Sequence, residues 1–350
     1  MDFSIAAILV QDGITSGAIY ALLALAIVLV FSVTRVIFIP QGEFVAYGAL
    51  TLAALQAQRL PLTCALLVAM GVLTFIAETT ALLRNVERRR DWKKDLPAVA
   101  GKYLAFPSAV FVLTRLYAGT TMPLPLQVML ALLIVIPMGP MLYRLAYQPL
   151  AKASVLMLLI VSVSVHLALT GLGLVMFGAE GVRTQPFSNA IHSVGALQIS
   201  GQSLWVIGIS AALIVLLYLY FEFTLSGKAL RATAVNGLGA QLLGISPARA
   251  GKLTFTLAAA MGAICGILIA PMTTIYYESG FLIGLKGFVG SIFGGLASYP
   301  AAAAGAFFVG LLESQSSFWA SAFKEVIVFT LILPVLLWRS LTSRHVEHEA

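Results

Sequence analysis

A polar break interrupts the apolar N-terminal part of the sequence. The four residues PQGE, 40–43, separate an apolar stretch at 4–33 from a shorter one at 43–57. Proline ends a helix, and a helix broken inside a membrane leaves backbone N–H and C=O groups free to bind a small solute. The carboxylate of Glu43 would add a charged group there. Two interpretations follow for this break: a solute-binding element, or a plain turn between two helices.

Other ionisable residues also lie within or beside apolar stretches, where a charge is costly and raises a functional hypothesis. Asp12 and Glu78 are near the ends of their stretches, so we expect charges at a membrane interface. His166 is central in 154–177 and is expected to form an interhelical hydrogen bond. Glu313 and the pair Lys324–Glu325 flank a turn and are expected to be solvated. These groups are too few to trace a proton relay.

The elements that position these residues follow from composition. Of the 350 residues 60% are hydrophobic and only 10% are charged, whereas soluble domains carry about 25% charged residues. Apolar segments long enough to cross a bilayer as helices recur throughout, so the fold class is an all-α polytopic membrane protein with about 8–11 transmembrane or re-entrant helices. The sequence 1–350 is predicted to form one transmembrane domain.

Some of the predicted segments are shorter than a bilayer requires. The stretches 43–57, 103–118 and 285–297 could be half-helices or re-entrant pieces, which are tolerated only when protein or a cavity surrounds them. The predicted apolar stretches are 4–33, 43–57, 62–83, 103–118, 124–142, 154–177, 203–223, 253–277, 285–297, 300–317 and 321–338.

The cations predict the orientation of the chain. Residues 84–102, a charged insertion, hold seven Lys or Arg against three acids, and 143–153, 224–252 and the tail after residue 338 are also basic. Positively charged loops stay in the cytoplasm, so the N-terminus is expected outside and the C-terminus inside. The net charge of +7 therefore reflects topology and membrane lipid rather than nucleic acid.

The basic loop 224–252 is too long for a simple turn between helices. Its Ala and Leu content favours helix, its glycines interrupt the helix, and Ser246-Pro247 can start another. It is predicted to form a short cytoplasmic helix and a glycine turn before the next span. Two roles are open: a knob that contacts a cytosolic partner, or an amphipathic helix on anionic lipid.

The sequence lacks the residues needed for nucleotide binding, metal binding and catalysis. We find no G-x-x-x-x-G-K-[ST] nucleotide motif, so energy must come from an ion gradient or a partner. Cys64 and Cys265 are far apart in apolar stretches and form no metal motif. No cluster of nucleophile, base or metal ligands is evident. We therefore expect no catalytic residues, no bound metal and no cofactor in this chain.

Four segments together resemble the membrane subunits of ATP-binding-cassette importers for branched-chain amino acids, the H-type permeases. They are "GAIYALLALAIVLVFSVTRVIFIPQGEFVAYGAL", "YRLAYQPL", "GKALRATAVNGLGAQLLGI" and "IFGGLASYPAAAAGAFFVGLLES". The resemblance covers most of the chain, and the order of the four segments is more specific than any one of them.

The resemblance implies function, partners and site residues. It implies import of branched-chain or other hydrophobic amino acids across the bacterial inner membrane, in complex with a second, M-type permease, two cytoplasmic ATPases that bind ATP and Mg, and a periplasmic solute-binding protein. The implied solute-pathway residues are Tyr20, Gln41, Gly42, Glu43, Gly294 and Gly295. In the loop 224–252, the residues implied to couple to the ATPase are Arg231, Asn236, Leu242, Leu243, Gly244 and Ile245.

The sequence also departs from this family. The family commonly has Asn and His before its G-[DE] pair, where this chain has Phe38 and Gln41, and Asn236 replaces an acidic residue. Region 58–140 is longer than usual. Related permeases also serve urea, short amides and aromatic acids, so the solute stays open. The alternative functions are a stand-alone secondary transporter or channel, which would need coupling acids, and a membrane-embedded enzyme.

Overall fold

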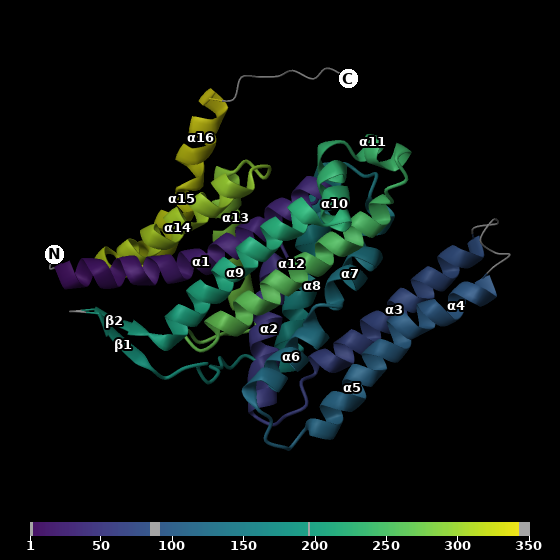
Figure 1. Cartoon of the computed structure of the whole chain (residues 1–350), viewed down its shortest axis with the longest axis horizontal. Helices are drawn as coiled ribbons and strands as arrows, with labels where there is room; N and C mark the ends of the chain where they lie inside the picture. Colours follow the sequence, from purple (N-terminus) through teal and green to yellow (C-terminus); the bar gives the residue numbers. More distant parts are fainter. Residues whose placement is uncertain (1–2, 85–91, 195–196, 343–350) are drawn as a thin grey trace.

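The computed structural model describes residues 3–84, 92–194 and 197–342 and is a bundle of helices (Figure 1). Within this part of the chain, eight helices are long and apolar enough to cross a membrane. The prediction of an all-α polytopic protein is therefore confirmed. The eight candidate spans are Ile5–Thr34, Thr63–Arg84, Leu96–Tyr117, Leu124–Leu150, Val155–Phe177, Gly201–Phe223, Pro247–Ile269 and Ser321–Trp338.

Most connections between helices are short, and a long one covers residues 178–200. The α-helices are α1 (Phe3–Thr34), α2 (Gln41–Gln56), α3 (Thr63–Arg84), α4 (Trp92–Ala100), α5 (Phe106–Tyr117), α6 (Leu124–Val135), α7 (Met138–Leu142), α8 (Val155–Phe177), α9 (Gly201–Phe223), α10 (Leu225–Val235), α11 (Gly237–Leu242), α12 (Pro247–Ile269), α13 (Ser279–Phe293), α14 (Tyr299–Trp319), α15 (Lys324–Thr330) and α16 (Ile332–Thr342). Wider or tighter helical turns occur at Gly101–Ala105, Tyr143–Tyr147, Gln148–Leu150 and Ser321–Phe323.

The core of the bundle contains two short helices. The 16-residue α2 packs against α12 and α13, the 15-residue α13 packs against α1, α2 and α14, and most residues of both helices are buried. Their length fits the prediction of short segments at 43–57 and 285–297, because surrounding protein satisfies their polar groups in place of lipid. Close approach of neighbouring helices is allowed by glycines on three helices: Gly13 and Gly17 on α1, Gly262 and Gly266 on α12, and Gly290 on α13.

The third segment predicted to be short is in fact long. Residues 103–118 belong to a continuous helical stretch, Leu96–Tyr117, that is long enough to span a membrane. It begins before the apolar run, in the charged insertion, and continues through Pro97 and a wider turn at Gly101–Ala105. In Figure 1, α3, α4 and α5 lie together at one side of the bundle. Residues 85–91 of the insertion 84–102 lie outside the described residues.

The two ends of the bundle differ. A two-stranded antiparallel hairpin, β1 (Ile191–Val194) and β2 (Leu197–Ser200), lies near the start of α9, whereas α10 and α11 lie at the opposite end of α9 (Figure 1). The hairpin is in the segment 178–200, which connects α8 to α9. An isolated bridge between Val182 and Ile275 joins this segment to the connection between α12 and α13.

Candidate functional site

The polar break at 40–43 lies deep inside the bundle. Glu43 is fully buried, and its Oε1 lies 2.8 Å from Nδ1 of His166 on α8. The prediction that His166 forms an interhelical hydrogen bond is confirmed, and its imidazole also stacks on Phe281 of α13 at 4.6 Å between ring centroids. The second carboxylate oxygen of Glu43 has no hydrogen-bond partner in the described residues. A buried acceptor without a partner is costly.

Gln41 and Gly42 hold the break between two other helices. The side-chain amide of Gln41 donates to the carbonyl of Ala258 on α12 at 3.0 Å, and its Oε1 is buried without a partner. A Cβ on Gly42 would overlap the carbonyl oxygen of Gly280 on α13, so only glycine allows α2 and α13 to approach this closely. The break is therefore a fixed packing element that holds two unpartnered acceptors, one each on Gln41 and Glu43.

The unusual residue before the break has a structural role. Phe38 is buried, and its ring lies 4.8 Å from that of Phe255, 5.8 Å from Tyr147 and 5.9 Å from Phe44. Such aromatic contacts stabilise a core beyond simple burial. Where relatives were expected to carry a polar side chain, this chain has an apolar cluster.

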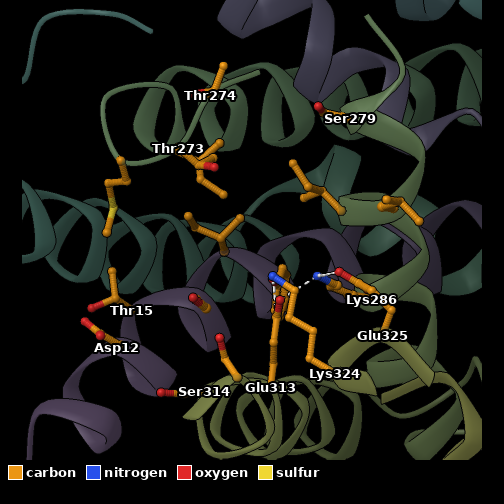
Figure 2. A pocket seen from close by; sticks show the side chains of 18 of the residues that line it. Asp12, Thr15, Thr273, Thr274, Ser279, Lys286, Glu313, Ser314, Lys324 and Glu325 are labelled. Atoms are coloured by element: carbon orange, nitrogen blue, oxygen red, sulfur yellow. Dashed lines mark hydrogen bonds and ion pairs between the residues drawn. The ribbon is translucent and has the colours of Figure 1, made fainter. Parts of the chain in front are cut away.

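A charged cavity of about 720 Å³ lies on one side of the N-terminal half of α1. It is lined by α1, the connection after α12, and α13 to α15, and Figure 2 shows charged and hydroxyl side chains around it. Lys286, which is only 6% exposed, donates to Glu313 Oε1 at 2.5 Å and to Glu325 Oε1 at 3.2 Å. Tyr20 donates its hydroxyl proton to the other oxygen of Glu313 at 2.5 Å.

This cavity corrects one prediction and adds a residue. Glu313 and Glu325 were expected to be solvated, but the Glu313 side chain is only 15% exposed and both carboxylates pair with Lys286. In the sequence Glu313 and Glu325 flank a turn, where side chains are usually exposed. The packing of α13 against α14 covers them. Lys286 was overlooked, although a lysine inside the apolar stretch 285–297 was the signal that pointed to it.

The remaining predicted pathway residues lie elsewhere. Gly295 lines a second cavity of about 780 Å³ near the C-terminal end of α1, together with Arg35, Arg231 and Tyr299. Gly294 packs against the start of α14. The structure thus separates the six predicted pathway residues into three places. Tyr20 lies at the charged cavity, 41–43 lie in the core, and 294–295 follow α13, where only Gly295 lines the second cavity.

Five of the six predicted coupling residues, all except Arg231, lie in a protruding knob, which we define as residues 236–245. Asn236 caps α11 by accepting a hydrogen bond from the Gly239 N–H at 2.9 Å. Leu242 and Leu243 are 85% and 81% exposed, and Gly244 has φ +83°, a conformation that favours glycine. Ile245 is half-buried behind them. An exposed pair of leucines at the tip of a short helix is an apolar contact surface.

Ion pairs between helices lie next to the knob. Arg231 on α10 pairs with Glu222 of α9 at 3.1 Å, on the exposed surface. Glu78 of α3 pairs with Lys252 of α12 at 2.5 Å and with Arg144 at 3.1 Å. Glu78 is therefore one partner in an ion-pair network that joins α3 to α12.

Comparison with known proteins decides the family. A family model described as "Branched-chain amino acid transport system / permease component" matches residues 100–336, more than half of the chain. The chain belongs to this family. The permease is 30% identical to the high-affinity branched-chain amino acid transport system permease protein LivH of Salmonella typhimurium, over 59% of its own length and 70% of that protein. No solved structure matches the permease significantly.

Other relatives agree. The permease is 30% identical to LivH of Escherichia coli strain K12 over 55% of its own length and 65% of that protein, and 26% identical to BraD of Pseudomonas aeruginosa over 68% and 80%. Both relatives are named as high-affinity branched-chain amino acid transport system permease proteins. The permease is therefore a multi-pass membrane subunit of a multi-subunit transport system and not a catalytic enzyme.

The buried Glu43–His166 pair gives a test of the central break. We expect Glu43→Gln to reduce solute uptake about tenfold, because it weakens a charge-assisted hydrogen bond in the core, while the amount of assembled permease changes little. Uptake should be normalised to the permease recovered from membranes. The matched control is Glu180→Gln, which alters an exposed acid. Normal uptake by Glu43→Gln would indicate that residues 40–43 are a plain turn between two helices.

Proposed function

We propose that this chain is the membrane-spanning permease of an ATP-driven importer, and that it translocates branched-chain or other hydrophobic amino acids delivered by a periplasmic binding protein. The family supports a permease of a branched-chain amino acid system. The observation that carries the ATP-driven part is the exposed apolar knob 236–245 on a chain whose sequence has no nucleotide-binding motif. A transporter that is driven by ATP but has no nucleotide site of its own needs a contact with an ATPase subunit.

The proposed assembly follows the resemblance of the sequence. A second, M-type permease, two cytoplasmic ATP-binding subunits and a periplasmic solute-binding protein would complete the transporter in the bacterial inner membrane. ATP and Mg would bind to the ATPase subunits. The N-terminus would lie outside and the C-terminus inside, since the loops at 84–102 and 224–252 carry the cations that stay in the cytoplasm.

In this proposal the knob transmits movement of the ATPase to the membrane helices. The hydrogen-bonded cap at Asn236 and the left-handed Gly244 fix both ends of α11, so the helix moves as a unit. Leu242 and Leu243 would insert into an apolar groove of the ATPase, and the pairing of Arg231 with Glu222 would pass its displacement to α9. The spans would then alternate access between the two sides of the membrane.

Co-purification tests the proposal. The complex is isolated from native membranes through a tag on the permease, and the bound subunits and ATPase activity are measured. We expect ATP-binding subunits in the complex, and about a 30-fold loss of their binding with Leu242→Asp, since buried anchor residues contribute about 2 kcal/mol or more. Leu341→Asp is the control, because Leu341 is 86% exposed but lies outside the knob.

Two results would contradict the proposal. A permease that purifies alone and still moves a solute along an ion gradient would be a stand-alone secondary transporter or channel. Equal recovery of the ATPase with Leu242→Asp and Leu341→Asp would make the knob a lipid-facing helix instead of a coupling element.

A further inference from the structure

The charged cavity beside α1 has an unusual composition for a membrane protein. It is lined by two lysines, Lys286 and Lys324, and by three carboxylates, Asp12, Glu313 and Glu325 (Figure 2). Burying ion pairs costs more than packing apolar residues of the same size. Stability alone therefore does not account for the partly buried cluster of Lys286, Glu313 and Glu325 at this cavity, and the arrangement needs another explanation.

Lys286, Glu313, Glu325 and Tyr20 form a central ion cluster at this cavity. The cluster leaves one hydrogen-bond donor and one acceptor unused. Both oxygens of Glu313 accept hydrogen bonds, one from Lys286 and one from Tyr20. The Lys286 ammonium has three N–H groups and makes hydrogen bonds to two acceptors, one on Glu313 and one on Glu325, among the described residues. Glu325 Oε2 is buried there without a partner. The Lys286–Glu325 pair thus retains a cationic donor beside an anionic acceptor.

A second pair of opposite charges faces the same cavity. Asp12 from α1 and Lys324 from α15 line it, and neither forms an ion pair within the part of the chain that the structure describes. Figure 2 shows both side chains at the cavity. The cavity therefore offers positive and negative groups together, which favours a ligand that carries both charges over a simple anion, cation or neutral amide.

The rest of the wall combines hydroxyl and apolar side chains. The cavity volume of about 720 Å³ is within the range of small-molecule sites. Hydrocarbon side chains lie around the charged groups, so a ligand with a charged head and an aliphatic tail can place both parts. The apolar lining includes Leu9, Ile19, Ile269, Met272, Leu282 and Ile283.

We propose that this cavity binds the zwitterionic head group of an α-amino acid, with the carboxylate at Lys286 and Lys324 and the ammonium at Glu325 and Asp12. This inference rests on the proposed importer function and narrows its solute class. It favours amino acids over urea, short amides and aromatic acids, because none of these presents an ammonium together with a carboxylate. The site is reached from the end of the bundle opposite the knob.

Protection of an introduced cysteine tests the site. Ser317 lines the cavity and is exposed, whereas the native Cys64 and Cys265 are buried, so Ser317→Cys should react selectively with a membrane-impermeant thiol reagent. The assembled transporter is labelled without its binding protein, in the presence of L-leucine, of 3-methylbutylamine, which lacks the carboxylate, or of 4-methylpentanoate, which lacks the ammonium. We expect L-leucine to slow labelling, with about tenfold higher concentrations needed for either analogue.

Charge variants complete the test. Lys324→Gln combined with Ser317→Cys should raise the L-leucine concentration for half-protection about tenfold. Lys324 is outside the central ion cluster, so its loss should leave the fold intact. The controls are Arg59→Gln and Glu180→Gln, which alter exposed charges away from the cavity and should leave protection unchanged.

The outcomes separate this inference from the proposed function. Equal protection by the three compounds, or unchanged protection in the Lys324→Gln variant, would overturn the head-group site. If the same complex shows ATP-driven leucine uptake but L-leucine does not protect the introduced cysteine, the head-group site is wrong. That result would not contradict the proposed importer function. Protection by L-leucine in a complex that shows no ATP-driven uptake would support the site and contradict the importer.

Discussion

Lys286→Met is expected to destabilise the permease by about 3–5 kcal/mol, because it leaves carboxylates unpaired in a largely buried cluster. Lys286 is the partner of both Glu313 and Glu325, and Tyr20 contacts the same cluster from α1. Removing the cation therefore affects the contacts between α13, α14, α15 and α1 at once. The measurement is the thermal unfolding midpoint of the detergent-solubilised permease, together with its yield from membranes.

Two further variants make this prediction specific. Lys228→Met removes an exposed cation on α10 and should leave the midpoint unchanged. Adding Glu313→Gln to Lys286→Met should restore part of the lost stability, because the remaining buried charge is reduced. If Lys286→Met unfolds at the wild-type temperature, water must reach the carboxylates, and the cluster does not hold these helices together.

Gly42→Ala is expected to separate α2 from α13, although it adds only one methyl group. The added Cβ would overlap the carbonyl oxygen of Gly280, and backbone atoms cannot move aside as a flexible side chain does. The shift would also disturb the neighbouring Glu43, whose hydrogen bond to His166 joins α2 to α8. We expect a loss of about 3 kcal/mol or more, the upper range for overpacking, and poor recovery of folded permease.

The control for this prediction is another helical glycine. A Cβ on Gly171 of α8 would meet no atom within 4 Å, so Gly171→Ala should be neutral or slightly stabilising, because alanine favours helix. Both variants are compared by unfolding midpoint and by yield. Equal stability of Gly42→Ala and Gly171→Ala would show that α2 and α13 are not as close as described.

Composition and pattern were sufficient for the class of protein. A chain with 60% hydrophobic and 10% charged residues must satisfy its backbone polar groups within helices, and the recurring apolar stretches show where most of those helices lie. The order of four sequence segments also pointed to the permease family, which the match over residues 100–336 confirms. These features are local, so they can be read without knowing which helices touch.

The contacts of the polar residues needed the tertiary structure. His166 was correctly expected to bond to another helix, but the sequence did not name Glu43, 123 positions away, as its partner. Glu313 and Glu325 were expected to be solvated because they flank a turn, and packing of α13 against α14 placed them around Lys286. Residues 103–118 were expected to be a short segment, although helix continues through the charged residues before them.

The candidate sites divide in the same way. The knob 236–245 was evident from the sequence, because its length, glycines and cap all lie within a single loop. The charged cavity was not, because its groups come from α1, α13, α14 and α15, and opposite charges in separate helices meet only when those helices pack. The sequence by itself determined that this chain is a helical membrane permease with a protruding basic loop. Only the tertiary structure decided which buried charges face each other, since that depends on helix packing rather than on local residue order.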